Sequence, residues 1–257
     1  KTDNTISKYL NLLSLMFKRA HNLGLTKFIP EMPTLKIVNQ SRTSYFNEEL
    51  NLINKKLQSE YDRTKEKEHL EIKDYINLIR SAGFRPGIQP LMIKNFQHQF
   101  LIDKQNPIEP ILQFTLFDTK TSPKHKLTCH PYFTKNIFPE IMNRVEKRSS
   151  EDYLLFPNEH NRQKLYNRIS KVFIRVSKEL DLYYRGGQSR PLYSIRHTFI
   201  SNRYNSGAPS AVIAKTSNTS EKMLREHYFD NEERMVIEDH RSMFQTKDKS
   251  VIKFKKK

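Results

Sequence analysis

Residues 218–228 read Asn-Thr-Ser-Glu-Lys-Met-Leu-Arg-Glu-His-Tyr, and the prediction of fold depends on the tyrosine that ends them, Tyr228. Upstream, residues 193–198 read Tyr-Ser-Ile-Arg-His-Thr, and residues 83–87 read Gly-Phe-Arg-Pro-Gly. A polar stretch with three lysines, residues 118–126, lies between the two arginine segments. The chain therefore presents an arginine, a lysine, a second arginine and a late tyrosine in that order.

These side chains suit covalent attack on a phosphodiester. Such attack needs a nucleophile, positive groups that neutralise the non-bridging oxygens, and a proton donor for the leaving oxygen. Tyrosine has a pKa of about 10, so it needs an electropositive site to act as a nucleophile. Arginine stays charged, and its planar guanidinium can bond two phosphate oxygens at once.

The ordered motifs resemble the catalytic domain of the tyrosine recombinases, the phage-integrase family, over roughly residues 45 to 230. The resemblance implies that Arg85 and Arg196 clamp the phosphate, that Lys120 protonates the leaving oxygen, and that Tyr228 is the nucleophile. Lys120 would lie at the tip of a hairpin, where Lys124 and Lys126 are rivals for the same role. The alternative for Arg85 is a surface arginine at a helix end without a catalytic role. The alternative for Tyr228 is an ordinary core tyrosine.

Four positions depart from the common pattern of the family. Ile88 stands where the family usually has a glutamate, three positions after the first arginine. Tyr193 and Thr219 stand at the two usual histidine positions, as in a branch whose second motif is Tyr-Ser-Leu-Arg-His-Thr. Both offer hydroxyl groups and no acid–base group near neutral pH. Asn218 replaces a glycine, and we expect it to tolerate a left-handed backbone there.

Composition favours a polyanionic partner. The 257 residues include 45 Lys+Arg and 28 Asp+Glu, a formal net charge of +17, which indicates nucleic acid ahead of membrane. Charge alone is also compatible with an ordinary basic protein with solvated faces. No stretch is long and apolar enough for a transmembrane helix.

No cofactor or metal is expected. The chain has one cysteine, Cys129, and six glycines. It therefore lacks an internal disulfide and a four-thiolate zinc site, and it has no Walker loop, no GxGxxG turn and no HExxH motif. We expect a reducing compartment, the cytoplasm, in association with the nucleoid.

The predicted fold class is mainly α with a small antiparallel β-sheet (α+β). Strands are expected at residues 99–102, 111–117 and 127–130, with a hairpin over 118–126. Apolar periodicity and turn residues predict the helices. These are expected at residues 5–23, 47–60, 66–82, 131–147, 161–180, 197–206, 208–216, 220–228 and 231–244.

Two parts are expected. Residues 1–44 would be the C-terminal remnant of a helical core-binding (SAM-like) domain with a linker, and residues 45–257 the catalytic domain with a tail. Because the chain begins at Lys1, we expect a processed form or a piece of a longer protein. The helix over 231–244 would pack either on its own domain or on a neighbouring protomer.

Further DNA contacts are expected outside the catalytic residues. Lys164, Arg168, Lys171 and Arg175 are spaced to line one side of a helix, with Arg162 just ahead; a solvated face is the alternative. Lys124 and Lys126 would contact phosphates from the hairpin. His197, beside Arg196, would support that arginine or contact DNA.

The resemblance implies site-specific strand exchange by an integrase of a phage, genomic island or transposon. The partners would be double-stranded DNA attachment sites and factors for directionality or bending. The chain would be a monomer when free and a homotetramer on DNA. The alternatives are a type IB topoisomerase and a non-catalytic DNA-binding regulator with the same fold.

Overall fold

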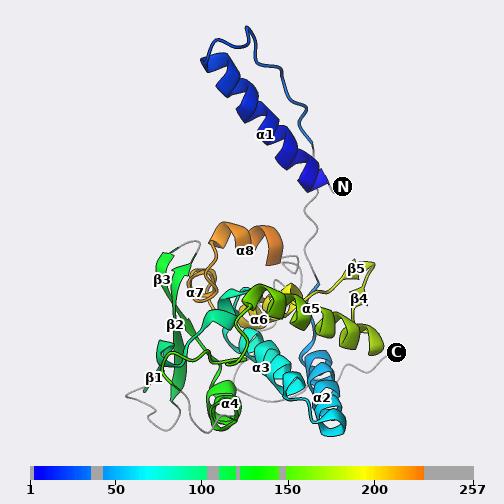
Figure 1. Ribbon diagram of the computed structural model, residues 1–257, viewed down its shortest axis with the longest axis vertical. Coiled ribbons are helices and arrows are strands. Elements are labelled where there is room, and N and C mark those ends of the chain that lie inside the picture. The colour runs from blue at the N-terminus through cyan, green and yellow to red at the C-terminus, as the bar shows by residue number, and fades with distance from the viewer. Residues whose placement is uncertain (1–2, 36–42, 103–109, 120–121, 145–148, 229–257) are drawn as a thin grey trace, which may run out of the picture. The chain divides into compact units, whose positions relative to one another are not determined.

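The computed structural model describes residues 3–35, 43–102, 110–119, 122–144 and 149–228 (Figure 1). The chain divides into two compact units, residues 1–40 and 41–257. In the part of the chain that is described, no helix is long and apolar enough to cross a membrane. Lys120 and the predicted helix over 231–244 lie outside the described residues.

The described part of the first unit contains the helix α1 (Asp3–Asn22), and Gly24 follows it with a left-handed φ of 70°. Its position agrees with the apolar periodicity of residues 5–23. Large apolar side chains such as Leu15 and Met16 are exposed within this unit. Its assignment as a remnant of a helical domain stays a prediction.

The second unit is mainly helical with a small antiparallel sheet, so the predicted fold class is confirmed (Figure 1). Three long helices form a common core: buried apolar residues recur every three or four positions on two of them, α2 (Asn47–Thr64) and α5 (Arg162–Glu179), whereas α3 (Lys67–Ala82) is buried on most of its sides. Each fully buried apolar side chain stabilises the fold by about 1.5–3 kcal/mol.

The main sheet has the strand order β1-β2-β3, all antiparallel. It consists of β1 (His98–Leu101), β2 (Ile111–Thr119) and β3 (Ser122–Thr128). Leu112 and Phe114 of β2 point into the core, and Phe114 is paired with Leu127 of β3. The two strands pair farther than predicted, as far as Thr119 and Ser122.

The last helices carry the second and third motifs. They are α6 (Tyr193–Asn205), α7 (Ser210–Thr216) and α8 (Glu221–Tyr228). The predicted start of the first of these at His197 is wrong by about one turn. The helix begins directly after Pro191-Leu192, where the backbone N–H of Ser194 donates to the carbonyl of Pro191 at 2.8 Å.

Two regions differ from the predicted helix and loop assignments. Where one regular helix over residues 131–147 was expected, the described residues form the π turn η3 (Phe133–Ile137) and the short helix α4 (Phe138–Asn143). A small hairpin, β4 (Tyr184–Arg185) and β5 (Gln188–Ser189), was not predicted; Gly186 and Gly187 form its turn with φ of 54° and 75°. The remaining short turns are the 3-10 helices η1 (Gln89–Met92) and η2 (Asn95–Gln97).

Candidate active site

Arg196 is the centre of the candidate site. It lies on α6 with only 2% of its surface exposed, and it donates from Nη1 to the carbonyl of Gly83 at 2.7 Å and from Nη2 to the carbonyl of Ser217 at 2.5 Å. Gly83 ends α3 and Ser217 ends α7. A single guanidinium therefore joins the segments that carry the first and third motifs.

The charge of Arg196 is not neutralised by a carboxylate among the described residues. Both of its bonds go to neutral carbonyl oxygens, and its Nε is buried without a hydrogen-bond partner in that part of the chain. A buried cation with a spare donor favours an anionic ligand.

Arg85 follows the same turn. Phe84 is fully buried, whereas Arg85 is exposed and has no hydrogen bond or ion pair with any described residue. The turn needs a glycine, since Gly83 has a φ of +68° and an added Cβ would lie 2.3 Å from the ring of Phe199. Arg85 is thus an exposed cation two residues from Gly83, whose carbonyl accepts from Arg196.

Tyr193 and His197 lie one turn apart on α6. Their ring centroids are 5.4 Å apart with the rings inclined at 63°. Tyr193 is half-buried, and His197 is only 6% exposed. Because His197 is buried, it is better placed to support the helix than to contact DNA. Contact of His197 with DNA stays a prediction.

The third motif begins with a turn at the end of α7. Asn218 has a φ of 51°, which confirms the expected left-handed backbone. Thr219 is half-buried, and its N–H donates to the carbonyl of Ala214 at 3.0 Å. Ser220 then accepts from the N–H of Met223 at 3.2 Å and caps α8, whose last residue is Tyr228. The side chain of Tyr228 lies outside the described residues.

The β2–β3 hairpin holds the candidate lysines. Lys120 is one of the two residues between the paired Thr119 and Ser122, outside the described part. Lys124 and Lys126 are exposed, and the ammonium of Lys124 lies 5.8 Å from the ring centroid of Phe117. The choice among the three lysines stays open.

His125, between the two exposed lysines, was missed by sequence reasoning. Its Nε2 is buried and has no hydrogen-bond partner among the described residues. Burial and, secondarily, the guanidinium of Arg196 lower the pKa of His125. The alternation Lys-His-Lys-Leu over residues 124–127 was the signal, because it places His125 on the inner face of a strand.

The arginines of α5 make contacts within the protein. Arg162 is 5% exposed, its guanidinium lies 3.5 Å from the ring centroid of Tyr153, and it donates to the carbonyl of Leu155 at 3.2 Å. Arg168 pairs with Glu68 and Glu159, and Arg175 pairs with Glu60 and Glu179. Lys164 and Lys171 are exposed. DNA contact through the arginines would require these contacts to open.

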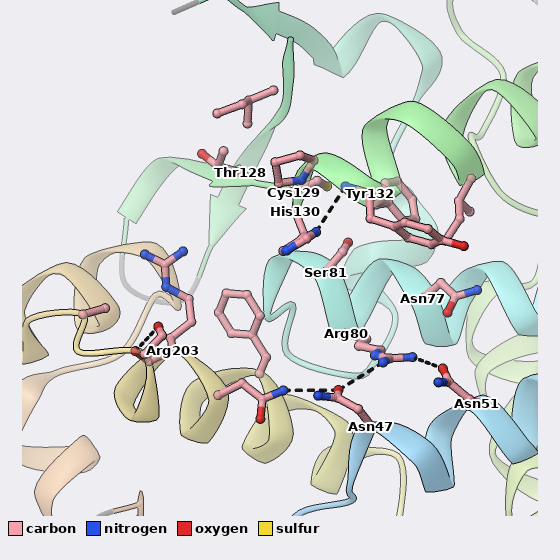
Figure 2. Close-up of a pocket in the computed structure, with 18 residues that line it drawn as sticks. Asn47, Asn51, Asn77, Arg80, Ser81, Thr128, Cys129, His130, Tyr132 and Arg203 are labelled. Carbon is pink, nitrogen blue, oxygen red and sulfur yellow. Dashed lines mark hydrogen bonds between the residues drawn. The ribbon is translucent and has the colours of Figure 1, made fainter. Parts of the chain in front are cut away.

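A cavity of about 820 Å³ lies elsewhere, between the start of α2, the end of α3, residues 128–133 and α6 (Figure 2). Arg80 lies in it and donates to Asn51 at 2.8 Å and to Asn47 at 3.0 Å. Among the catalytic candidates whose side chains the structure describes, Arg85, Tyr193, Arg196 and Thr219, none lines this cavity. Across the described ranges, no group of three His, Cys, Asp or Glu residues could hold a metal ion.

Solved structures share this fold. The chain is similar to the Tn1549 transposon integrase in complex with transposon right end DNA, with a TM-score of 0.60 and 15% identity over 95% of this chain and 80% of that one. It is similar to a lambda integrase dimer bound to a COC′ core site, with a TM-score of 0.58 and 14% identity over 95% of this chain and 75% of that one.

The XerH site-specific recombinase bound to palindromic difH substrate is a third similar structure, with a TM-score of 0.56 and 15% identity over 80% of this chain. The matched part spans about half, 54%, of the XerH chain. No family model and no curated protein matches the sequence. The chain therefore has the tyrosine recombinase catalytic-domain fold.

Proposed function

We propose that this protein is a site-specific DNA recombinase that cleaves and rejoins DNA through a 3′-phosphotyrosyl intermediate at Tyr228. The observation that carries the proposal is the pair of bonds from Arg196 to the carbonyls of Gly83 and Ser217. They join the three motifs around a buried cation whose charge no described carboxylate neutralises.

In this mechanism the phenolate oxygen of Tyr228 attacks the scissile phosphorus, and the bond to the 5′ oxygen of the next nucleotide breaks. Arg85 and Arg196 neutralise the charge that develops on the non-bridging oxygens. Lys120 gives its proton to the leaving 5′ oxygen, with Lys124 as the rival donor.

Rejoining reverses these steps. A 5′ hydroxyl from the same or a partner duplex attacks the phosphotyrosyl phosphorus, and Tyr228 leaves. Because the covalent link retains the energy of the phosphodiester, the reaction needs neither ATP nor a metal ion. The hydroxyl groups of Tyr193 and Thr219 would supply the hydrogen bonds that histidines supply in most relatives.

The substrates would be attachment sites of a phage, genomic island or transposon. Two duplexes and four protomers would exchange strands through a Holliday junction, with further factors setting direction. The full protein would carry out this reaction in the nucleoid.

Covalent trapping tests the proposal. Duplexes with a randomised central region are passed over the immobilised protein, and retained sequences are rebuilt with a nick just downstream of the cleavage site, so that the short fragment carrying the free 5′ hydroxyl diffuses away. Wild type, Tyr228→Phe and the matched control Tyr184→Phe, an exposed tyrosine on β4, are then incubated with these duplexes. We expect an SDS-resistant adduct with wild type and Tyr184→Phe, and none with Tyr228→Phe.

Other outcomes would point elsewhere. Specific binding without an adduct in any of the three proteins would favour the DNA-binding regulator. An adduct together with relaxation of supercoiled plasmid by the monomer, and no strand exchange, would favour a type IB topoisomerase.

A further inference from the structure

His125 occupies an inner position on β3. It is paired with Leu116 of β2, which is 4% exposed. Leu127, two residues along, is buried, whereas the flanking Lys124 and Lys126 are exposed. Because alternate residues of a strand point to opposite faces, the imidazole is directed toward the protein interior while the lysines face outward.

The interior beside β3 contains the candidate active site. Helix α7 packs against β3 and leads into α8 (Figure 1). Ser217, at the end of α7, accepts the hydrogen bond from Nη2 of Arg196. Arg196 is close enough that its charge, added to burial, lowers the pKa of His125. Both effects favour the neutral form of the imidazole.

Two buried polar atoms are without partners among the described residues, Nε2 of His125 and Nε of Arg196, and the guanidinium of Arg196 acts electrostatically on the imidazole. A buried polar group without a hydrogen bond costs about 1–3 kcal/mol, so such atoms call for an explanation. Nε of Arg196 can only donate, and Nε2 of a neutral histidine donates when it carries the proton. A ligand that satisfies both must accept two hydrogen bonds, as a phosphate does.

We propose that His125 contacts the scissile phosphate: its Nε2–H donates to a non-bridging oxygen of the phosphate that Arg196 also binds. The inference rests on the proposed function and deepens it. It places an imidazole donor in a site where both usual histidine positions, Tyr193 and Thr219, offer only hydroxyl groups.

Cleavage rates of variants on the nicked duplexes test this role. The variants are His125→Ala, His125→Gln, which keeps an N–H donor without an ionisable ring, and His130→Gln, a control on an exposed histidine just beyond β3. Loss of one such donor lowers the cleavage rate by about 10²–10³-fold. We expect this for His125→Ala, with most of the rate retained in His125→Gln and all of it in His130→Gln.

Urea midpoints and the affinity for uncleaved duplex separate this effect from misfolding. Wild-type cleavage in folded His125→Ala would overturn the proposal, and so would a His125→Gln variant as slow as His125→Ala. If His125→Ala does not fold, the rate of His125→Gln decides.

A duplex with a bridging sulfur at the 5′ position shows whether His125 acts on the leaving group or on a non-bridging oxygen. A thiolate leaves without a proton, so this duplex needs no proton donor. The defect of His125→Ala should persist on this duplex, since the lost bond is to a non-bridging oxygen. Full recovery would assign His125 to the leaving group and overturn the proposal. If the wild-type protein forms no adduct, both the proposed function and the role of His125 are overturned. If wild type forms the adduct and His125→Ala cleaves at the same rate, only the role of His125 is overturned.

Discussion

At the scale of single residues, Arg196 serves both stability and the proposed chemistry. Its guanidinium satisfies two backbone carbonyls at the ends of α3 and α7 while retaining a buried donor without a partner among the described residues. Arg85 differs, because it is exposed and makes no contact of this kind in the described part. The two arginines should therefore respond differently to substitution.

Arg85→Ala should leave the free energy of unfolding within about 0.5 kcal/mol of wild type, as exposed substitutions usually do. It should lower the rate of adduct formation by about 10²–10³-fold, because one clamp on the phosphate is lost. Arg196→Ala should lose both activity and about 3 kcal/mol of stability, since two charge-assisted hydrogen bonds disappear. Urea denaturation and the trapping assay measure the two effects; equal loss of stability in both variants would contradict this division.

At this scale, the backbone of one turn in the candidate site could be predicted from the sequence. The left-handed backbone of Asn218 follows from its short polar side chain. The burial of Arg196 between two chain turns could not be predicted, because its partners Gly83 and Ser217 are backbone groups that carry no sequence signal. His125 was missed for a similar reason, since its significance depends on helices packed against the strand.

At the scale of elements, helix ends determine where the polar groups of the site lie. The end of α3 is shaped by Gly83, whose left-handed backbone and close approach to Phe199 leave no space for a side chain. This contact links α3 to α6, the helix that carries Arg196.

Gly83→Ala should destabilise the protein by about 2–4 kcal/mol, from the left-handed backbone and the overlap with Phe199 together. Gly207→Ala is the matched control, because its φ is +81° and nothing lies within 4 Å of the added Cβ. It should cost about 1–2 kcal/mol from backbone strain alone. Thermal or urea unfolding would refute the packing argument if the two variants were equally stable.

An ion pair between α2 and α5 should make stability sensitive to acid. Glu60 accepts from Arg175 at 2.7 Å, and this bond is the main cause that lowers the pKa of Glu60 below 4.5. The stabilisation is thus fully present above pH 4.5 and is lost as the pH falls through the lower pKa of the folded state.

Glu60→Gln should therefore reduce the fall in urea midpoint between neutral and acidic pH, by an amount equivalent to about 1–2 kcal/mol. His69 contributes to the same site, because its Nε2 lies 3.1 Å from Glu60. An acid dependence that is unchanged in the variant would show that other carboxylates control it.

The elements themselves were largely predictable where periodicity is long, as in α2, α3 and α5. Short elements were less so. The two-residue strands β4 and β5 carry no periodicity, and only the Gly186-Gly187 pair marked their turn. The start of α6 was misplaced because tertiary contacts of Arg196 and Thr198 hold the first turn in helical form.

At the scale of the whole molecule, the net charge of +17 should dominate DNA binding. The affinity should fall by about 10³-fold or more between roughly 50 and 200 mM salt, because each phosphate contact releases counterions. The slope of log affinity against log salt measures this effect. A slope near zero would contradict a binding mode based on phosphate contacts.

The same measurement distinguishes the basic residues of α5. Lys164→Gln should reduce the slope by about 0.9, because its exposed ammonium is available to a phosphate. Arg168→Gln should leave the slope unchanged, because Arg168 already pairs with Glu68 and Glu159. A reduced slope in Arg168→Gln would show that the ion pairs open on DNA and would restore the original prediction.

Peptide mapping of the trapped adduct is the decisive test of Tyr228 as the nucleophile. The SDS-resistant complex is digested with protease and nuclease, and tandem mass spectrometry locates the residue that carries the nucleotide. We expect a 3′-linked nucleotide on Tyr228 and on no other tyrosine. A nucleotide on another residue, a 5′ linkage, or specific DNA binding with no covalent product would contradict this expectation.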